Sequence, residues 1–480
     1  MRSQVSTLAG IALLSLATAN VSVSAEILPT QPLWQFQWAL ENNETSQGVC
    51  TTVPWDGTCQ HDAVLPLADM DINANSVWAG PATASAATAS QRVTPPILIG
   101  MIDTGIDYQH PDLRHHVWNN PGELLGSDNN ANGVDDGCED GVDNDQNGYI
   151  DDCHGINALV PASLSPGVLN PVAGDPMDSA LAHGTHMAGL MIGDTGNGYG
   201  IRGVAGNANV QIVTCKAAQQ EPVLELVPGT VVPALTQARM KQCVDYFIAL
   251  KQRGENLAVI NTSGGMSAYI NLGLMWAKVK KDYLLDPEIF LPLLAKLHEM
   301  DVLVVAAAGN MTWDMDTRFD ERAYFPAAFS ADNVLSVTAL DAQGNLWSNS
   351  SYGRYSVDVG APGHQILSSL PPNASNTAEA NYGITSGTSP ATALVSGLAA
   401  LLRASPETAN LSAPQLRRLI MASGRPLASL ADKTVSGRSI RVYDSNGSGA
   451  FSCNNQWIQR RVTPRTNQMT LLPGDTLHLE

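Results

Sequence analysis

Four short apolar segments, separated by longer segments with helical patterns, are the feature of this sequence that most restricts its fold. They lie at residues 97–102, 210–215, 257–262 and 302–308. Each segment is apolar at successive positions rather than at alternate ones, which is typical of strands buried on both faces of a parallel sheet. This alternation of strands and helices predicts an α/β fold with a mostly parallel central sheet and helices on both faces.

The segments between the expected strands carry the start and stop signals of helices. One helical pattern runs from about residue 235 to 253 and ends at Gly254. A second has Asp286 as its N-cap and Pro287 at its first helical position, where a missing N–H is tolerated. A third pattern begins at Ser389 and stays apolar through Leu402. We therefore expect a helix in each of these three places.

Changes in composition divide the chain into four parts. Residues 1–25 have a positive start, an apolar centre and a small-residue cleavage site, which together predict a secretory signal peptide. Residues 26–96 form an N-terminal segment and linker, and the stretch at 81–96 is rich in Ala, Thr and Ser. We expect one catalytic domain at residues 97–445, with an acidic insertion at 119–157, and a short tail at 446–480.

The charge of the chain restricts its partners. The formal net charge is −19, and eight acidic residues between positions 135 and 152 stand together without one Lys or Arg. This balance argues against nucleic acid or an anionic membrane as a partner, and it favours a soluble protein that binds a cation. Because the apolar part of the signal is too short to span a bilayer, we expect a secreted, periplasmic or extracellular monomer without membrane contact.

The seven cysteines belong in an oxidising compartment if the signal peptide is functional, and pairing is then the default. Cys215 lies in an expected strand and Cys243 in an expected helix, so these two either pair or serve as small buried apolar residues. Cys453 has no evident partner. Two further pairs, each closing a loop rich in turn residues, are expected to form: Cys50 with Cys59, and Cys138 with Cys153.

Three residues with the chemistry of nucleophilic catalysis stand at the ends of expected strands and helices. Asp103 ends the first strand, where open α/β sheets place their ligands. His183 and Ser389 each open an apolar helix. A serine hydroxyl needs a base to take its proton, and the base needs a carboxylate to hold its tautomer. The sequence therefore predicts a catalytic triad of Asp103, His183 and Ser389, in the order Asp, His, Ser.

The motifs around these residues resemble those of the subtilisin-like serine proteases, the subtilases. The resemblance extends from about Pro32 to about Asp444 and implies a subtilisin-like fold and a serine endopeptidase that acts on polypeptides. Seven short motifs carry it, in the order found in the family. They are Asp103-Thr104-Gly105, His183-Gly184-Thr185-His186, the segment 259–265, the segment 306–310, Phe325-Pro326-Ala327, Ala361-Pro362-Gly363 and Gly387-Thr388-Ser389.

The same resemblance assigns the oxyanion hole and the substrate-binding segment. It implies that the side-chain amide of Asn310 and the backbone N–H of Ser389 stabilise the oxyanion of the tetrahedral intermediate. It also implies that Ser263, Gly264 and Gly265 pair with the substrate backbone as an added strand. Family members usually carry a larger side chain where Gly264 stands, so the wall of the adjacent pocket is expected to differ.

Departures from the family pattern are concentrated in the helix that follows the nucleophile. Pro390 stands where Met is usual, Ala393 where Pro is usual and Leu394 where His is common. Outside that helix, His186 is expected to be a packed residue rather than a second base.

The acidic insertion resembles a calcium (Ca2+) loop. Oxygen-bearing residues stand at loop positions 1, 3, 5 and 9, and Gly148 stands at position 6, where a sharp turn is needed. Position 12 is His154 instead of a bidentate Glu, so the loop must borrow a ligand, with Asp152, Asp140 or Asp136 as candidates. A solvated acidic loop without metal remains the alternative. The expected ligands of a structural calcium ion are Asp143, Asp145, Asn147, Tyr149 and Asp151. Asp112 and Asn197 are similar to a second calcium site of the family.

Two other functional classes compete with the serine protease. Asp103 and Asp194 each open an Asp-Thr-Gly segment after apolar residues, as in an aspartic protease that shares one proton between two carboxylates. That alternative leaves the motifs around His183, Asn310 and Ser389 unexplained. The second alternative is a catalytically inactive relative that binds peptides or calcium, although no triad residue is missing from the sequence.

Overall fold

The structure is a computed structural model. It describes most of the chain between residues 95 and 442, a few residues before that stretch, and two short strands after it. The earlier described residues are 33, 37, 39–40, 50–52, 60–61 and 72. Within the main stretch the structure does not describe 126–137, 139, 179–180, 222–231, 268–285, 318–323 and 373–380.

A nine-stranded sheet forms the centre of the molecule, with the strand order β18-β19-β15-β14-β12-β10-β3-β7-β4. Every neighbouring pair is parallel except β18 with β19. The four expected strands are β3, β7, β10 and β12, and β10 and β14 are buried at every position because helices cover both faces. The bounds are β3 Ile97–Asp103, β4 Gly155–Asn157, β7 Val210–Lys216, β10 Leu257–Thr262, β12 Leu303–Ala307, β14 Val334–Leu340, β15 Val359–Pro362, β18 Arg425–Pro426 and β19 Arg438–Ser439.

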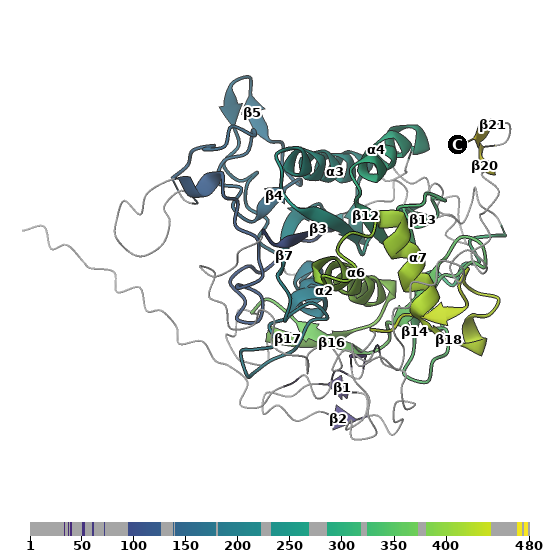
Figure 1. Cartoon of the computed structure of the whole chain (residues 1–480). Coiled ribbons are helices and arrows are strands. Elements are labelled where there is room, and N and C mark those ends of the chain that lie inside the picture. Colours follow the sequence, from purple (N-terminus) through teal and green to yellow (C-terminus); the bar gives the residue numbers. More distant parts are fainter. Residues whose placement is uncertain are drawn as a thin grey trace, which may run out of the picture.

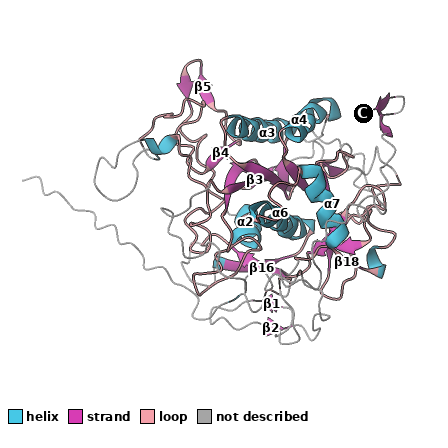
Figure 2. Cartoon of the chain, in the orientation of Figure 1, coloured by secondary structure: helices cyan, strands magenta, loops and turns pink. Residues whose placement is uncertain are grey.

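Helices cover both faces of this sheet, so the predicted fold class is confirmed (Figure 1). Helices α3 and α4 lie on one face, and α2 and α6 lie on the other (Figure 2). Two separate apolar cores result. Phe247 of α3 and Leu294 of α4 belong to one core, and Met187 of α2 and Leu398 of α6 belong to the other. The bounds are α2 His183–Ile192, α3 Gln237–Gln252, α4 Pro287–Glu299, α6 Thr388–Ala404 and α7 Ala413–Ser423.

Two of the expected helix starts agree with the structure, and the third is shifted. Asp286 caps α4, because its carboxylate accepts a hydrogen bond from the backbone N of Glu288 at 3.0 Å. Helix α6 begins at Thr388 rather than at Ser389, so Ser389 is already helical. Pro390 is the third helical residue, where its missing N–H costs no hydrogen bond, since the first four N–H groups of a helix have no partner within it.

Short two-stranded sheets and single turns of 3₁₀ helix complete the described elements. The pairs are β1 with β2, β5 with β6, β8 with β9, β11 with β13, β16 with β17 and β20 with β21, all antiparallel. Their bounds are β1 Cys50–Thr52, β2 Gln60–His61, β5 Ser163–Ser165, β6 Val168–Leu169, β8 Ala218–Glu221, β9 Val232–Leu235, β11 Met266–Ser267, β13 Tyr324–Phe325, β16 Ile366–Ser369, β17 Tyr382–Thr385, β20 Gln468–Leu472 and β21 Asp475–His478, with η3 at Glu123–Leu125 and η7 at Ala428–Leu430.

Parts of the segment before residue 95 pack into the main domain. Leu40 and Ile72 are buried in the core that contains α2 and α6. The side chain of Gln37 accepts a hydrogen bond from the backbone N of Arg202 at 2.8 Å and donates one to the carbonyl of the same residue at 3.0 Å. The backbone N of Leu33 donates to the carbonyl of Gly200 at 2.8 Å. These residues are therefore integral to the fold, although composition alone places them in an appendage.

Two disulfides are present among the described residues. The bond between Cys138 and Cys153 confirms the prediction for that pair. Cys215 of β7 and Cys243 of α3 are also bonded, which settles the alternative that the sequence leaves open for them. Cys59 and Cys453 lie outside the described residues, so the expected pairing of Cys50 with Cys59 stays a prediction.

Candidate active site

Three neighbouring strands of the sheet and two helices bring the candidate residues together. Asp103 is the last residue of β3, and Ser263 follows the adjacent strand β10 directly. Asn310 comes three residues after β12, the next strand in the sheet. Because these strands are parallel, their carboxyl ends lie at the same edge, where open α/β sheets place their ligands. His183 and Ser389 enter from the first turns of α2 and α6.

Asp103 and His183 form a close pair. Nδ1 of His183 lies 2.7 Å from Oδ1 of Asp103, and the side chains are 35% and 2% exposed respectively. The backbone N of Thr104 donates to the same carboxylate oxygen at 2.7 Å. Since a carboxylate only accepts, Nδ1 of His183 carries the proton, and Nε2 of the neutral ring is left as the proton acceptor.

A second carboxylate, that of Asp178, joins the Asp103 loop to helix α2. Its Oδ1 accepts from the hydroxyl of Thr104 at 2.8 Å, and its Oδ2 accepts from the backbone N of Thr185 at 2.9 Å. The hydroxyl of Thr104 in turn accepts from the backbone N of Gly184 at 2.9 Å. Burial disfavours the charged imidazolium, but the charge and hydrogen bond of Asp103 and the charge of Asp178 outweigh it and raise the pKa of His183.

The hydroxyl of Ser389 takes a different partner from the expected one. It donates to the carbonyl of Ser263 at 2.8 Å, and no hydrogen bond joins Ser389 to His183 among the described residues. The hydroxyl of Ser263 donates back to the carbonyl of Ser389 at 3.2 Å. Catalytic hydrogen bonds are often absent or long without substrate and form in the complex, and rotation about one bond redirects a serine hydroxyl.

Asn310 is held in one orientation by Thr388. Its Oδ1 accepts from the backbone N of Thr388 at 2.8 Å and from the Thr388 hydroxyl at 2.9 Å. Because a backbone N–H can only donate, Oδ1 and Nδ2 of Asn310 cannot exchange places, and Nδ2 is left to donate elsewhere. A methyl group added to Gly387 would lie 3.1 Å from that Nδ2 and 3.6 Å from the backbone N of Ser389. The missing side chain of Gly387 therefore leaves open a space next to both donors.

The expected substrate-binding segment lies beside the nucleophile. Ser263 is buried, whereas Gly264 and Gly265 are half-buried. A methyl group on Gly264 would meet no atom within 4 Å. The space on that side of the segment is therefore open, in agreement with the absence of a larger side chain at this position.

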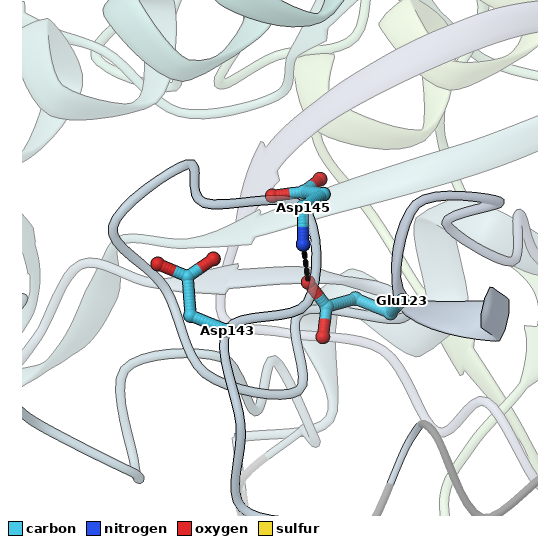
Figure 3. Close-up of side chains that lie close together, drawn as sticks. All are labelled: Glu123, Asp143 and Asp145. Carbon is cyan, nitrogen blue, oxygen red and sulfur yellow. Dashed lines mark hydrogen bonds between the residues drawn. The ribbon is translucent and has the colours of Figure 1, made fainter. Parts of the chain in front are cut away.

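The acidic insertion brings three carboxylates together. Oxygen atoms of Glu123, Asp143 and Asp145 all lie within 4.8 Å of one another (Figure 3). The sequence pointed to Asp143 and Asp145 but missed Glu123, which is in η3 and fully buried. Burial raises the pKa of Glu123 to about 7, with smaller contributions from the two neighbouring carboxylates. Carboxylate oxygens are the ligands that calcium prefers, so the donor set of this cluster suits that ion.

The other expected ligands of the insertion lie around this cluster in different roles. The side chain of Asn147 turns to the carboxylates of Asp145 and Asp152, to which its Nδ2 donates at 3.1 Å and 2.9 Å. The hydroxyl of Tyr149 accepts from Gln242 at 3.2 Å. Oδ2 of Asp151 accepts from the backbone N of Gly141 at 3.2 Å. Asp151, which carries a carboxylate, is not part of the three-carboxylate cluster.

The second expected calcium pair is also in contact. Nδ2 of Asn197 donates to Oδ1 of Asp112 at 2.6 Å, and the backbone N of Ile201 donates to the other oxygen at 3.0 Å. Asp112 is fully buried, and burial raises the pKa of its carboxyl to about 6. The two residues are thus brought together through a direct hydrogen bond, and the calcium site expected at them stays a prediction.

Two other residues weighed from the sequence have partners away from the site. His186 is buried, and its Nε2 lies 3.1 Å from the carbonyl of Ile366, so it packs between elements as expected. Burial lowers the pKa of His186 to about 3. Asp194, the second residue of the aspartic-protease alternative, contacts His115 at 3.3 Å and not Asp103. The shared-proton carboxylate pair of that alternative is therefore absent.

The fold and the site together define a class of protein. A parallel α/β sheet with an Asp–His pair, a serine at a helix start and a fixed asparagine amide at one edge is the arrangement that the subtilase-like motifs of the sequence predict. The sequence profile described as "Subtilase family" matches residues 95–440. The chain therefore belongs to the subtilase family.

Comparison with individual proteins agrees with this assignment. The chain is 30% identical over 318 residues to "Subtilisin-like protease 1" of Plasmodium vivax, covering 64% of this chain and 40% of the relative. It is 29% identical over 309 residues to "Thermophilic serine proteinase" of a Bacillus species, covering 63% of this chain and 51% of the relative. The chain thus spans about half or less of these relatives. A solved structure of a protease from Pseudoalteromonas arctica covers 86% of this chain and 97% of its own, with a TM-score of 0.51 at 18% identity, which is a likeness of fold.

Proposed function

We propose that this chain is a secreted endopeptidase that cleaves polypeptides through an acyl-enzyme, with Asp103, His183 and Ser389 as its triad. The 2.7 Å contact between Asp103 and His183 is the observation that carries the proposal. It leaves Nε2 of His183 free to take the proton of Ser389 as Oγ attacks the substrate carbonyl carbon. His183 then gives this proton to the leaving amine as the C–N bond breaks. Water repeats the sequence to release the acid and restore Ser389.

The oxyanion formed in each step is stabilised by Nδ2 of Asn310 and the backbone N–H of Ser389. Support comes from the two hydrogen bonds of Thr388 to Asn310, which fix the amide before substrate arrives. The N-terminus of α6 adds its positive dipole end at the same place. Ser263, Gly264 and Gly265 align the substrate as an added strand.

A calcium ion stabilises the acidic insertion in this proposal, held by Asp143, Asp145 and Glu123, with Asn147, Tyr149 and Asp151 as further candidates. The close approach of the three carboxylates supports it, because like charges at such distances repel one another and the Arg253 guanidinium contacts only Asp145 among the three. A second ion at Asp112 and Asn197 requires the amide of Asn197 to turn its Oδ1 toward the site, since Nδ2, a donor, faces the carboxylate in this structure.

Secretion is supported by the signal-like residues 1–25 and by the two disulfides, which persist in oxidising compartments. None of the described helices is long and apolar enough to cross a membrane.

The proposed activity is tested with a serine-directed fluorophosphonate and a mixed peptide library. We expect the purified protein to be labelled at Ser389 and to cleave peptides, and we expect Ser389→Ala to do neither. If the wild-type protein binds peptides without cleaving them and takes no label, the chain is a catalytically inactive relative and the proposal is wrong.

A further inference from the structure

The ring of Tyr324 lies between the substrate-binding segment and the loop that carries Asn310. Tyr324 is the first residue of β13 and pairs with Ser267 of β11. A methyl group added to Gly265 would lie 2.6 Å from Cε1 of the Tyr324 ring. A methyl group added to Gly309 would lie 3.2 Å from Cδ1 and Cγ of the same ring. The Cδ1–Cε1 edge of the ring therefore lies against both glycines, with its outer end next to Gly265 and its inner end next to Gly309.

The Tyr324 ring is held in place by packing against an apolar cluster and by a hydrogen bond at its hydroxyl group. It packs against the buried side chains of Ala308, Met315 and Val357. Burial raises the pKa of its phenol to about 12, and the backbone of Gly265 hydrogen-bonds to the phenol group. The ring is thus neutral at all working pH values and tied to the substrate-binding segment itself. Its displacement would break that hydrogen bond and remove apolar surface from its contacts.

The catalytic geometry determines which part of a substrate approaches this ring. The reacting carbonyl must lie next to Oγ of Ser389, with its oxygen toward Nδ2 of Asn310 and the backbone N of Ser389. In the proposed alignment, the substrate backbone before that carbonyl pairs with residues 263–265 as an added strand. The side chain of the residue that supplies the carbonyl must therefore point into the gap between Gly265 and the 309–310 loop, which is where the Tyr324 ring lies.

We propose that Tyr324 closes this gap and restricts the residue on the acyl side of the scissile bond to small side chains: Gly, Ala or Ser. This inference rests on the proposed endopeptidase function and names its substrate class. Among the described residues, Tyr324 narrows the gap between Gly265 and Gly309, whereas a methyl group on Gly264 meets no atom within 4 Å, so the side next to Gly264 is open. A side chain as large as Phe would overlap the ring, and a pocket rejects groups that it cannot hold.

Two tetrapeptide anilides that differ only in their last residue, Ala or Phe, test the restriction. We expect the wild-type protein to have a kcat/KM about 10-fold or more higher for the Ala substrate, since even one methylene changes this constant about 10- to 200-fold. Tyr324→Ala should raise the ratio of Phe to Ala turnover by about 10-fold or more. Tyr324→Phe is the matched control: it keeps the ring and removes only the hydroxyl, so the preference for Ala should persist.

The ratio of kcat/KM for the Phe substrate to that for the Ala substrate is independent of how much of the enzyme is folded. The preference of the wild-type protein is measured without any variant. A cleavage-site profile of the wild-type protein on an unfolded protein substrate should show Gly, Ala or Ser before the cut. A wild-type protein that prefers Phe or Leu, or a Tyr324→Ala variant with an unchanged ratio, would overturn the role of Tyr324 and leave the endopeptidase function intact. If neither substrate is cleaved and no fluorophosphonate label appears at Ser389, the endopeptidase function fails and the inference fails with it.

Discussion

Oδ1 of Asn310 lies 2.8 Å from the backbone N of Thr388, the residue before the candidate nucleophile. This hydrogen bond joins the oxyanion-binding amide to the first residue of the helix that carries Ser389. The position of the donor and that of the nucleophile are therefore coupled, and a change that moves the start of α6 also moves Nδ2 of Asn310.

Removing the amide of Asn310 should weaken catalysis without weakening substrate binding. We expect Asn310→Ala to lower kcat about 10²- to 10³-fold, the size typical of losing one oxyanion-hole donor, with little change in KM. Thr388→Val keeps the backbone hydrogen bond and loses the hydroxyl one, so its loss in kcat should be smaller. Steady-state kinetics on one peptide substrate measure both. Equal losses for the two variants would show that Asn310 acts only through the position of the helix.

Loss of a triad residue should abolish nearly all turnover. We expect Ser389→Ala and His183→Ala each to lower kcat by about 10⁶-fold, the scale for residues that act as one unit in this family. The double variant should be no worse than either single variant, because each already removes the whole nucleophilic route. Sensitive fluorogenic assays with active-site titration measure this. A Ser389→Ala variant that retains near-normal turnover would contradict the proposed nucleophile.

The raised pKa of His183 sets the acid limit of activity. His183 must be neutral to accept the serine proton, so activity is present above its pKa and is lost as pH falls through it. Since Asp103 and Asp178 raise this pKa, the acid limb of kcat/KM should lie above the ordinary histidine value of about 6.5. Asp178→Asn removes one of the two charges and should move the limb to lower pH. Asp332→Asn, which changes an exposed carboxylate, is the control and should leave the acid limb of the pH profile in place. If Asp178→Asn also leaves the acid limb in place, the charge of Asp178 does not raise the pKa of His183.

Removal of divalent cations should destabilise the acidic insertion. We expect a chelator to lower Tm and excess calcium to restore it, because a ligand that binds the native state stabilises it by mass action. Glu123→Gln and Asp143→Asn should reduce the response to calcium, whereas Glu299→Gln, on an exposed helix face, should not. Thermal melts with metal analysis of the purified protein measure this. If the protein holds no calcium and its Tm ignores chelation, the solvated-loop alternative is correct.

Local signals explain the parts of the fold that the sequence predicts well. Strand β10 spans the expected residues because its apolar run is bounded by polar positions, and α4 begins at Pro287 because Asp286 and the proline act within one turn. The start of α6 is the instructive exception. A Pro disfavours helical backbone in the residue before it, which points to Ser389 as a cap. Thr388 donates two hydrogen bonds to Asn310, which lies in a loop far away in the sequence. These hydrogen bonds favour a start of α6 at Thr388, one residue earlier than expected.

Contacts between segments far apart in sequence are the features of the site that could not be predicted from the sequence. Glu123 meets Asp143 and Asp145 across an intervening stretch of about 20 residues, and no local pattern marks it as a ligand. Tyr324 is an ordinary residue before the Phe325-Pro326 motif until the structure places its ring against Gly265 and Gly309. Both depend on tertiary packing, which overrides local propensity.

Pro390 should make the active site resistant to oxidation. Relatives usually carry Met after the nucleophile, and its sulfoxide places a polar, bulkier group beside the reacting serine. Pro390 is buried in the first turn of α6 and has no sulfur to oxidise. We therefore expect the wild-type protein to keep most of its activity in peroxide that inactivates Pro390→Met, with Pro390→Ala as the control for the loss of the ring.

The remaining methionines near the site decide how this result is interpreted. Met187 and Met266 are 0% and 3% exposed, so both are shielded from peroxide. Met311 follows Asn310 directly and is half-buried, and its methyl carbon would lie 3.4 Å from a methyl group added to Gly309. The Met311→Leu variant, which lacks this methionine, is therefore the reference protein. Its loss of activity in peroxide should be compared with that of the double variant Met311→Leu/Pro390→Met. Peptide mapping by mass spectrometry identifies the oxidised residues. If the Met311→Leu protein loses activity in peroxide as fast as Met311→Leu/Pro390→Met does, residue 390 does not control oxidative inactivation.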